Sequence, residues 1–244
     1  MANKEPKVKV QNLTKRFGDL LVLDNLNFEV EEGEFLCIVG PTGCGKTTFL
    51  NSLTRLYEPT AGDILVNGIP VDPKKQNISY IFQEYSSFPW LTVEQNIRFG
   101  LEIKKTPKAE ADANVEEMLD IVGLTKFRNY YPSQLSISML QRVAIARAFA
   151  TKPELLLMDE PYGQLDIDLR FKLEDELIKL WKKTGTTVLF ITHNIEEAVY
   201  LSQKIMVLTN KPTSVKTVLD NPLPLPRDVV SPEFVELDQM VVMS

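Results

Sequence analysis

Residues 35–48 read FLCIVGPTGCGKTT, and this stretch decides the fold. The first five residues are continuously apolar, which is typical of a strand buried on both faces of a parallel sheet. Residues 40–47 match the pattern G-x-x-x-x-G-K-[ST], in which glycines let successive backbone N–H groups turn inward around a chain of phosphates. Apolar residues at helical spacing in 46–56 then predict a helix, whose N-terminus adds partial positive charge. The stretch therefore predicts a strand, a phosphate-binding loop and a helix.

The residue types of this phosphate loop indicate what it binds. The Lys46 side chain can reach the β- and γ-phosphates of a nucleotide, and the Thr47 hydroxyl can ligate Mg²⁺. ATP and Mg²⁺ are therefore the expected cofactors. The alternative, a glycine-rich turn that happens to precede a lysine, is disfavoured by the strand and the helix on either side. The expected nucleotide-binding residues of the loop are Gly40, Pro41, Thr42, Gly43, Cys44, Gly45, Lys46, Thr47 and Thr48.

A second apolar run, LLLM at residues 155–158, ends in the carboxylates of Asp159 and Glu160. A buried strand that ends in aspartate places that side chain at the carboxyl edge of the sheet, where open α/β sheets bind ligands. Asp159 is the expected Mg²⁺ ligand, directly or through water. Glu160 is the expected catalytic base that orients and deprotonates the attacking water. The alternative, a solvated acidic pair or a helix cap, is weakened by the phosphate loop upstream.

The composition excludes several classes of protein. The 244 residues carry 27 Lys and Arg against 33 Asp and Glu, a formal charge of −6, so nucleic acid is not an expected partner. One histidine and two cysteines, Cys37 and Cys44, cannot build a zinc site of His and Cys ligands. The Cys44 thiol lies beside Lys46, where its pKa can fall, but we favour the alternative that it is a small residue that fits the loop. No apolar run approaches the ~20 residues of a membrane span, and residues 1–10 lack the apolar region of a signal peptide, so we expect an intracellular chain.

The order of the predicted elements indicates an α/β fold with a mainly parallel sheet. Residues 8–13, 26–40 and 63–71 read as strands with turn signals and predict an antiparallel β subdomain on the N-terminal side. Further strands are expected at 155–158, 187–191 and 205–208, with helices between them. We expect a P-loop NTPase core of about 1–91 and 151–210, with a helical subdomain inserted at about 92–150. The Pro-rich residues 211–244 are expected to form a loosely patterned appendage, all within a single domain of residues 1–244.

Together these motifs resemble the ATP-binding subunits of ABC transporters, and the resemblance covers essentially the whole chain. It identifies Gln83, after the strand ISYIF, as a glutamine that contacts Mg²⁺ and the attacking water. It identifies His193, after the strand TVLFI, as the histidine that contacts the γ-phosphate, and Asp166 as an aspartate that acts across a dimer. Phe17 falls where the family places an aromatic ring that stacks on adenine. Each alone has a plainer alternative (a polar strand end, a solvated histidine, a core aromatic), but their joint order favours the resemblance.

The resemblance also implies partners. Phrases such as YPSQLS, MDEPYGQLD, ITHNIEEAVYL and PLPLPR are most similar to importers of the nitrate, sulfonate and taurine type. Such an importer would consist of transmembrane permease subunits, a second ATP-binding subunit and a separate solute-binding protein, and this chain would lie at the cytoplasmic face of the membrane. The segment SSFPWLTVEQNI, residues 86–97, resembles the surface that receives the coupling helix of the permease.

The chain departs from the family at its signature, Leu-Ser-Gly-Gly, which the family presents to the γ-phosphate held by the partner subunit. The corresponding residues are Leu135, Ser136, Ile137 and Ser138. Glycine suits a close backbone approach or a positive φ, whereas a β-branched isoleucine disfavours positive φ and adds bulk. Three explanations remain: a heterodimer with one competent site, a homodimer with two weakened sites, or an altered sequence. We favour the heterodimer, because the residues expected to catalyse hydrolysis are intact and only the signature, which acts on the partner's nucleotide, differs from the family. Gln164, at a position where relatives carry small residues, also favours the heterodimer.

A rival function has no permease. A soluble P-loop protein could use ATP as a switch or transfer its phosphate to a small molecule. Such a kinase needs an acceptor pocket and basic lid residues. Residues 92–150 instead read as an apolar-periodic helical segment, which favours the transporter subunit.

Overall fold

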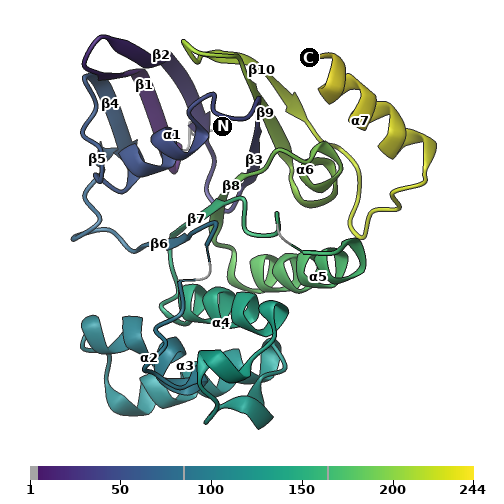
Figure 1. Ribbon diagram of the computed structural model, residues 1–244. Coiled ribbons are helices and arrows are strands. Elements are labelled where there is room, and N and C mark those ends of the chain that lie inside the picture. The colour runs from purple at the N-terminus through teal and green to yellow at the C-terminus, as the bar shows by residue number, and fades with distance from the viewer. Residues whose placement is uncertain (1–4, 85, 164) are drawn as a thin grey trace. The chain divides into compact units, whose positions relative to one another are not determined.

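The computed structural model describes residues 5–84, 86–163 and 165–244, so Gln164 lies outside the described residues. The chain packs into two compact units (Figure 1), the first of residues 1–76 with 187–244 and the second of residues 77–186. The division into a core, a helical subdomain and a tail within one domain stays a prediction. In the described ranges, no helix is both long enough and apolar enough to cross a bilayer.

The first unit contains an antiparallel sheet with the strand order β2-β1-β4-β5. Its strands are β1 (Val8–Phe17), β2 (Leu20–Val30), β4 (Ala61–Val66) and β5 (Ile69–Pro70). Val8 pairs with Val30 on one side and with Val66 on the other, so that alternating apolar residues of the three long strands point into one core. The antiparallel subdomain that the sequence predicts is confirmed.

The phosphate loop follows a strand of a second sheet. The strand β3 (Phe35–Val39) runs parallel to β8 (Thr187–Ile191) on one side and to β9 (Lys204–Leu208) on the other. Every residue of β3 and β8 is buried, as predicted by the apolar sequence of β3 and by the four apolar residues that follow Thr187 in β8. The helix α1 (Lys46–Leu53) follows the loop, and α6 (Ile195–Leu201) follows β8. Both helices begin beside the carboxyl ends of these strands, where a ligand site is expected.

The expectation that residues 211–244 are loosely patterned is not met, because the segment forms regular secondary structure. This segment forms β10 (Val215–Asp220), which pairs antiparallel with β9, and the helix α7 (Pro232–Met243). The helix buries Phe234, Leu237 and Val241, which lie at helical spacing. The sequence pattern does not predict β10, because the strand lies at a sheet edge between two prolines and has exposed Val218 on its outer face, so its apolar residues do not follow its alternating burial.

The second unit contains two parallel strands, β6 (Ile78–Ile81) and β7 (Leu155–Asp159), and the predicted helical segment. That segment forms α2 (Val93–Ile103), α3 (Lys108–Ile121) and α4 (Ile137–Ala150), with short 3₁₀ turns at Thr125–Phe127 and Pro132–Gln134. The helix α5 (Ile167–Thr184) follows β7. The apolar residues whose spacing predicts helices, among them Val93, Ile97, Val115 and Leu119, are buried.

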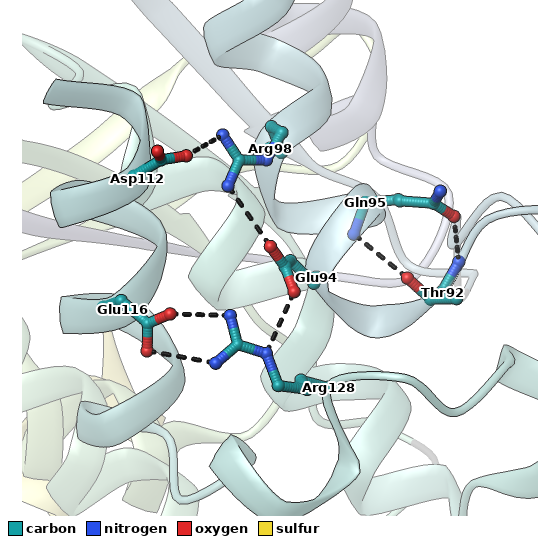
Figure 2. A network of polar contacts seen from close by, with 7 residues as sticks. All are labelled: Thr92, Glu94, Gln95, Arg98, Asp112, Glu116 and Arg128. Atoms are coloured by element: carbon teal, nitrogen blue, oxygen red, sulfur yellow. Dashed lines mark hydrogen bonds and ion pairs between the residues drawn. The ribbon is translucent and has the colours of Figure 1, made fainter. Parts of the chain in front are cut away.

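Ion pairs fix the start of α2 to its neighbours (Figure 2). The Thr92 side chain accepts the Gln95 backbone N–H and the Gln95 side chain accepts the Thr92 N–H, which forms a capping box. Glu94, in the first turn, pairs with Arg98 at 3.2 Å and with Arg128 at 2.9 Å. Two further pairs join these arginines to α3, Arg98 with Asp112 at 2.7 Å and Arg128 with Glu116 at 2.6 Å. The network therefore ties α2, α3 and the segment after α3 together.

Replacing Glu94 by glutamine is expected to lower the thermal-unfolding midpoint at pH 7 by about 2–4 °C, or ~1 kcal/mol for a chain of this size. The hydrogen bond from Arg128, with that from Arg98, holds the pKa of Glu94 below its ordinary 4.5. A carboxyl with a depressed folded-state pKa stabilises above that ordinary value and loses its contribution as the pH falls through the folded pKa. The difference between wild type and variant should thus be full above about pH 5 and shrink below pH 4.5. Calorimetry from pH 3 to 8 measures it; the exposed Glu102→Gln on the same helix should show no such difference.

Candidate functional site

The phosphate loop can adopt its path only with glycine at specific positions. Gly43 and Gly45 have φ values of 75° and 120°, which side chains disfavour. A Cβ atom on Gly45 would lie 2.9 Å from Val22 Cγ1, and one on Gly40 would lie 3.0 Å from Leu208 Cβ. The loop therefore packs so closely against β2 and the end of β9 that a side chain at Gly40 or Gly45 would need a neighbour to move.

The loop and the start of α1 present a lysine and backbone donors together. The buried Lys46 ammonium donates hydrogen bonds to the carbonyls of Gly40 (2.8 Å) and Pro41 (3.2 Å). Gly45 is the N-cap of α1 and has no side chain with which to cap it, so the first-turn N–H groups suit a bound anion. Burial raises the pKa of the Cys44 thiol, with Lys46 acting in the opposite direction. This shift supports the reading of Cys44 as a small fitting residue.

His193 lies beside the beginning of the phosphate loop. It is exposed and directly precedes Asn194, whose side chain accepts the Glu197 N–H at 3.2 Å and caps α6. A cavity of about 440 Å³ in the first unit is lined by His193, Gly40 and Pro41, together with Leu208, Lys216 and Val242. The structure thus brings the histidine and the loop to one cavity, which also reaches α7. The sequence order alone does not reveal this contribution of the C-terminal helix.

Phe17 is the last residue of β1 and presents an aromatic surface at the turn to β2. Its side chain is 42% exposed. One edge contacts the Tyr57 ring, with centroids 5.2 Å apart, and the Lys15 ammonium lies 4.8 Å from the centre of the Phe17 ring. The ring is therefore held in place but keeps exposed surface on which a base could stack.

In the second unit, the carboxylate of Asp159 is buried at the end of β7. The Tyr80 hydroxyl donates a hydrogen bond to Asp159 Oδ2 at 3.2 Å. Burial, together with the Asp159 charge, raises the pKa of this hydroxyl, so Tyr80 remains a donor at neutral pH. Sequence reasoning missed Tyr80; the parallel pairing of β6 with β7 brings the two side chains together.

Glu160 and Gln83 follow the ends of these two strands. Glu160 is half-buried and has φ 46°, a left-handed backbone that costs free energy in any residue other than glycine. Its carbonyl accepts the Gly163 N–H at 3.3 Å. Gln83 is exposed two residues beyond β6. Both positions are consistent with residues that meet a ligand outside the carboxyl ends of the strands.

Two of the residues expected to act in trans, Ser136 and Asp166, are helix caps. Ser136 Oγ accepts the Met139 N–H at 3.3 Å at the start of α4 and lies 3.0 Å from Ser138 Oγ. Ile137 is the first residue of the helix, and its side chain is 50% exposed. Asp166 is exposed and caps α5 by accepting the Leu169 N–H at 3.0 Å. Residues 136–139 therefore form a normally capped helix start that presents an isoleucine to solvent.

An aromatic groove lies on the second unit near Gln83. Its volume is about 420 Å³, and its lining includes Tyr80, Phe82, Phe88, Phe99 and Arg147. The Arg147 guanidinium donates to the Ser86 carbonyl at 2.8 Å and lies 5.2 Å from the centre of the Phe88 ring. Trp90, whose ring centroid is 5.6 Å from that of Phe88, is 69% exposed.

Residues 23–163, more than half of the chain, match the family described as ABC transporter. The chain belongs to the ABC transporter family. An ABC transporter ATP-binding protein of Methanocaldococcus jannaschii is 45% identical over 240 residues, 97% of this chain and 90% of that protein. An aliphatic sulfonates import ATP-binding protein of Bacillus cereus is 41% identical over 229 residues, 94% of this chain and 90% of that protein.

Solved ABC cassettes share the fold of this ABC subunit. The cbiO1 protein of Clostridium perfringens, part of the ABC transporter complex cbiONQ, is 25% identical with a TM-score of 0.80, covering 90% of each chain. A dimeric ATP-binding cassette in a post-hydrolysis state with ADP and Pi is 32% identical with a TM-score of 0.77, covering 89% of this chain and 100% of that chain. The predicted fold class is confirmed. This ABC subunit is an ATPase that binds ATP with Mg²⁺, as its family does.

Proposed function

We propose that this ABC subunit hydrolyses ATP to energise an importer of a small solute, an anion or a sulfur or nitrogen compound. The observation that carries the proposal is the phosphate loop, with its buried lysine and a histidine at the same cavity. The printed function of its Bacillus cereus relative, aliphatic sulfonate import, supports the solute class. Closure of a dimer on ATP and its reopening after hydrolysis would supply the motion.

The residues proposed for the metal fit Mg²⁺. In the described ranges, no group of three or more His, Cys, Asp or Glu could hold a metal ion. Mg²⁺ does not need such a group, because it is commonly bound through one or two carboxylates together with substrate phosphates. Asp159, the Thr47 hydroxyl and the Gln83 amide supply the oxygen atoms that this ion prefers. When bound, Mg²⁺ would neutralise charge on the β- and γ-phosphates.

The chain's own groups have separate proposed roles in the reaction. Lys46 and the first-turn N–H groups of α1 hold the phosphates, and Phe17 stacks on the adenine. The Glu160 carboxylate orients the attacking water and accepts its proton, and Gln83 positions that water. His193 donates a hydrogen bond to the γ-phosphate.

The partners are proposed from the surface of the second unit. The aromatic groove and the exposed Trp90 suit a helix with an apolar face, as a permease coupling helix would present. The capped and ion-paired start of α2 would hold this surface in one shape while it transmits force. We place the subunit at the cytoplasmic face of the membrane, with a separate solute-binding protein upstream.

We further propose that the dimer is a heterodimer with one competent site, and that a homodimer would have two weakened sites. The exposed Ile137 side chain at the start of α4 supports the proposal, because it adds bulk where a partner-bound phosphate would approach. The Ser136 hydroxyl remains as a donor, and the N-terminus of α4 remains as the positive end of the helix dipole. Asp166 would meet the partner subunit from the start of α5.

Steady-state ATPase assays of the purified chain test this function. The variant carrying both Ile137→Gly and Ser138→Gly is expected to hydrolyse ATP about tenfold faster than the unmodified chain, because an unobstructed donor near the γ-phosphate stabilises the transition state. Ile137→Ala, which removes bulk without adding glycine, should recover only part of the gain. Equal rates for the unmodified and glycine chains would exclude an impaired signature. Transfer of phosphate to a small acceptor instead of water would exclude the transporter function and favour a kinase.

A further inference from the structure

Thr213, in the segment between β9 and β10, makes a direct contact with the phosphate loop. Its side chain is completely buried, with 0% exposed. Its hydroxyl donates a hydrogen bond to the carbonyl oxygen of Cys44, 169 residues earlier in the chain. Both residues belong to the first unit. The C-terminal segment therefore reaches the loop that is proposed to hold the phosphates.

The backbone of Thr213 is itself fixed by β2. Its N–H donates to the Val22 carbonyl at 2.9 Å, and its carbonyl accepts the Asp24 N–H at 2.8 Å. Together these bonds form a parallel bridge to Leu23. A Cβ atom on Gly45 would meet Val22, Leu23 and Thr213 Oγ1, the last at 3.6 Å. Thr213 thus packs between β2 and the phosphate loop, next to Gly45.

The bond to the Cys44 carbonyl controls the peptide unit that links Cys44 to Gly45. In a planar trans peptide the carbonyl and the following N–H point in opposite directions. Holding the Cys44 carbonyl towards Thr213 therefore turns the Gly45 N–H away from Thr213. Gly45, with φ 120° and ψ 13°, has no Cβ to limit its rotation, so this peptide unit needs an outside restraint.

We propose that Thr213 is a positioning residue of the nucleotide site, which aims the Gly45 N–H at the bound phosphates. The inference rests on the proposed function of the loop and extends it to a residue of the C-terminal segment. Thr213 does not touch the nucleotide. It acts through the orientation of one backbone donor. Loss of the Thr213 hydroxyl should therefore lower the affinity for phosphate strongly and the stability of the fold only slightly.

Thr213→Val tests the proposal, because valine keeps the branched shape and removes the hydroxyl. We expect the Kd for ADP, measured with Mg²⁺ by isothermal titration calorimetry, to rise about tenfold, or about 1.4 kcal/mol. Thr213→Ser keeps the hydroxyl and loses a buried methyl group, so it should bind ADP as wild type does while its thermal-unfolding midpoint falls. A merely structural role would make affinity and midpoint change together in both variants.

Ser202→Ala is the matched control. Ser202 is also completely buried in the first unit, and its hydroxyl donates to the Ala198 carbonyl at 2.7 Å, away from the phosphate loop. Its loss should lower the midpoint and leave ADP affinity unchanged. Wild-type affinity in Thr213→Val, weak binding in Thr213→Ser, or equal weakening in Ser202→Ala would each overturn the positioning role. Failure of the wild-type chain to bind ADP would instead refute the proposed function of the loop.

Discussion

Replacing Glu160 by glutamine is expected to lower kcat for ATP hydrolysis by about 10²–10⁴-fold and to leave ATP affinity nearly unchanged. A neutral amide cannot accept the proton of the attacking water, whereas the phosphates are held mainly by the loop and α1. The left-handed backbone at position 160 costs glutamate and glutamine alike, so the substitution should preserve the local fold. Single-turnover phosphate release and equilibrium ATP binding measure the two quantities separately.

The Glu102→Gln variant controls for the loss of one carboxylate, because Glu102 is exposed on α2. It should hydrolyse ATP at the wild-type rate. Turnover by Glu160→Gln within a few-fold of wild type would remove Glu160 from the role of base. A parallel loss of ATP affinity would show that the side chain binds nucleotide instead.

Replacing Arg227 by methionine is expected to lower the free energy of unfolding by about 3 kcal/mol, or 6–12 °C in the midpoint. Arg227 is only 8% exposed, and its guanidinium donates to the carbonyls of Val199 and Tyr200, both at 2.8 Å. It also donates twice to the Leu223 carbonyl at 3.2 Å. Burial lowers the pKa of Arg227 to about 10, so the side chain is still charged at neutral pH. Methionine would fill a similar volume and remove the donor to the Tyr200 and Leu223 carbonyls, whereas the Val199 carbonyl would keep its bond from Asn221 Nδ2 at 2.8 Å.

Differential scanning calorimetry of Arg227→Met and Arg227→Lys at pH 7 measures this effect. Lysine keeps the charge but lacks the planar fork, so it should recover only part of the loss. A midpoint within 2 °C of wild type for Arg227→Met would contradict a stabilising role for the C-terminal segment. An equal decrease of the midpoint in both variants would show that the whole effect depends on the planar geometry of the guanidinium.

The local sequence pattern was sufficient to predict the interior of the fold. The strand β3 and the loop after it could be predicted because both faces of the strand are apolar and the loop needs glycines at fixed spacing. The buried positions of Arg227 and Thr213 could not be predicted in the same way, because a polar residue in a Pro-rich segment is ordinarily expected to be exposed to solvent. Their partners, the end of α6 and the Cys44 carbonyl, are defined only once the sheet has formed.

In the candidate site, too, some residues could be predicted from local sequence and others could not. Motif spacing places Lys46 and Glu160 directly, and both occupy the strand-to-helix positions that the sequence predicts. Tyr80 carries no motif; it contacts Asp159 because two strands 77 residues apart, starting at Ile78 and Leu155, pair in parallel register. The capping of α4 by Ser136 follows from a local rule, yet the exposure of Ile137 depends on what packs around the helix start.

The bond between Thr213 and Cys44 has a consequence for biosynthesis. The two residues are separated by 169 positions, so at ~5–20 residues per second about 8–34 s of translation lie between them. The phosphate loop therefore leaves the ribosome well before the hydroxyl that holds its Cys44–Gly45 peptide. On the proposed role of Thr213, the nucleotide site of a nascent subunit stays incomplete until the segment between β9 and β10 has been synthesised. Tight nucleotide binding is then expected only after Thr213 has joined the fold.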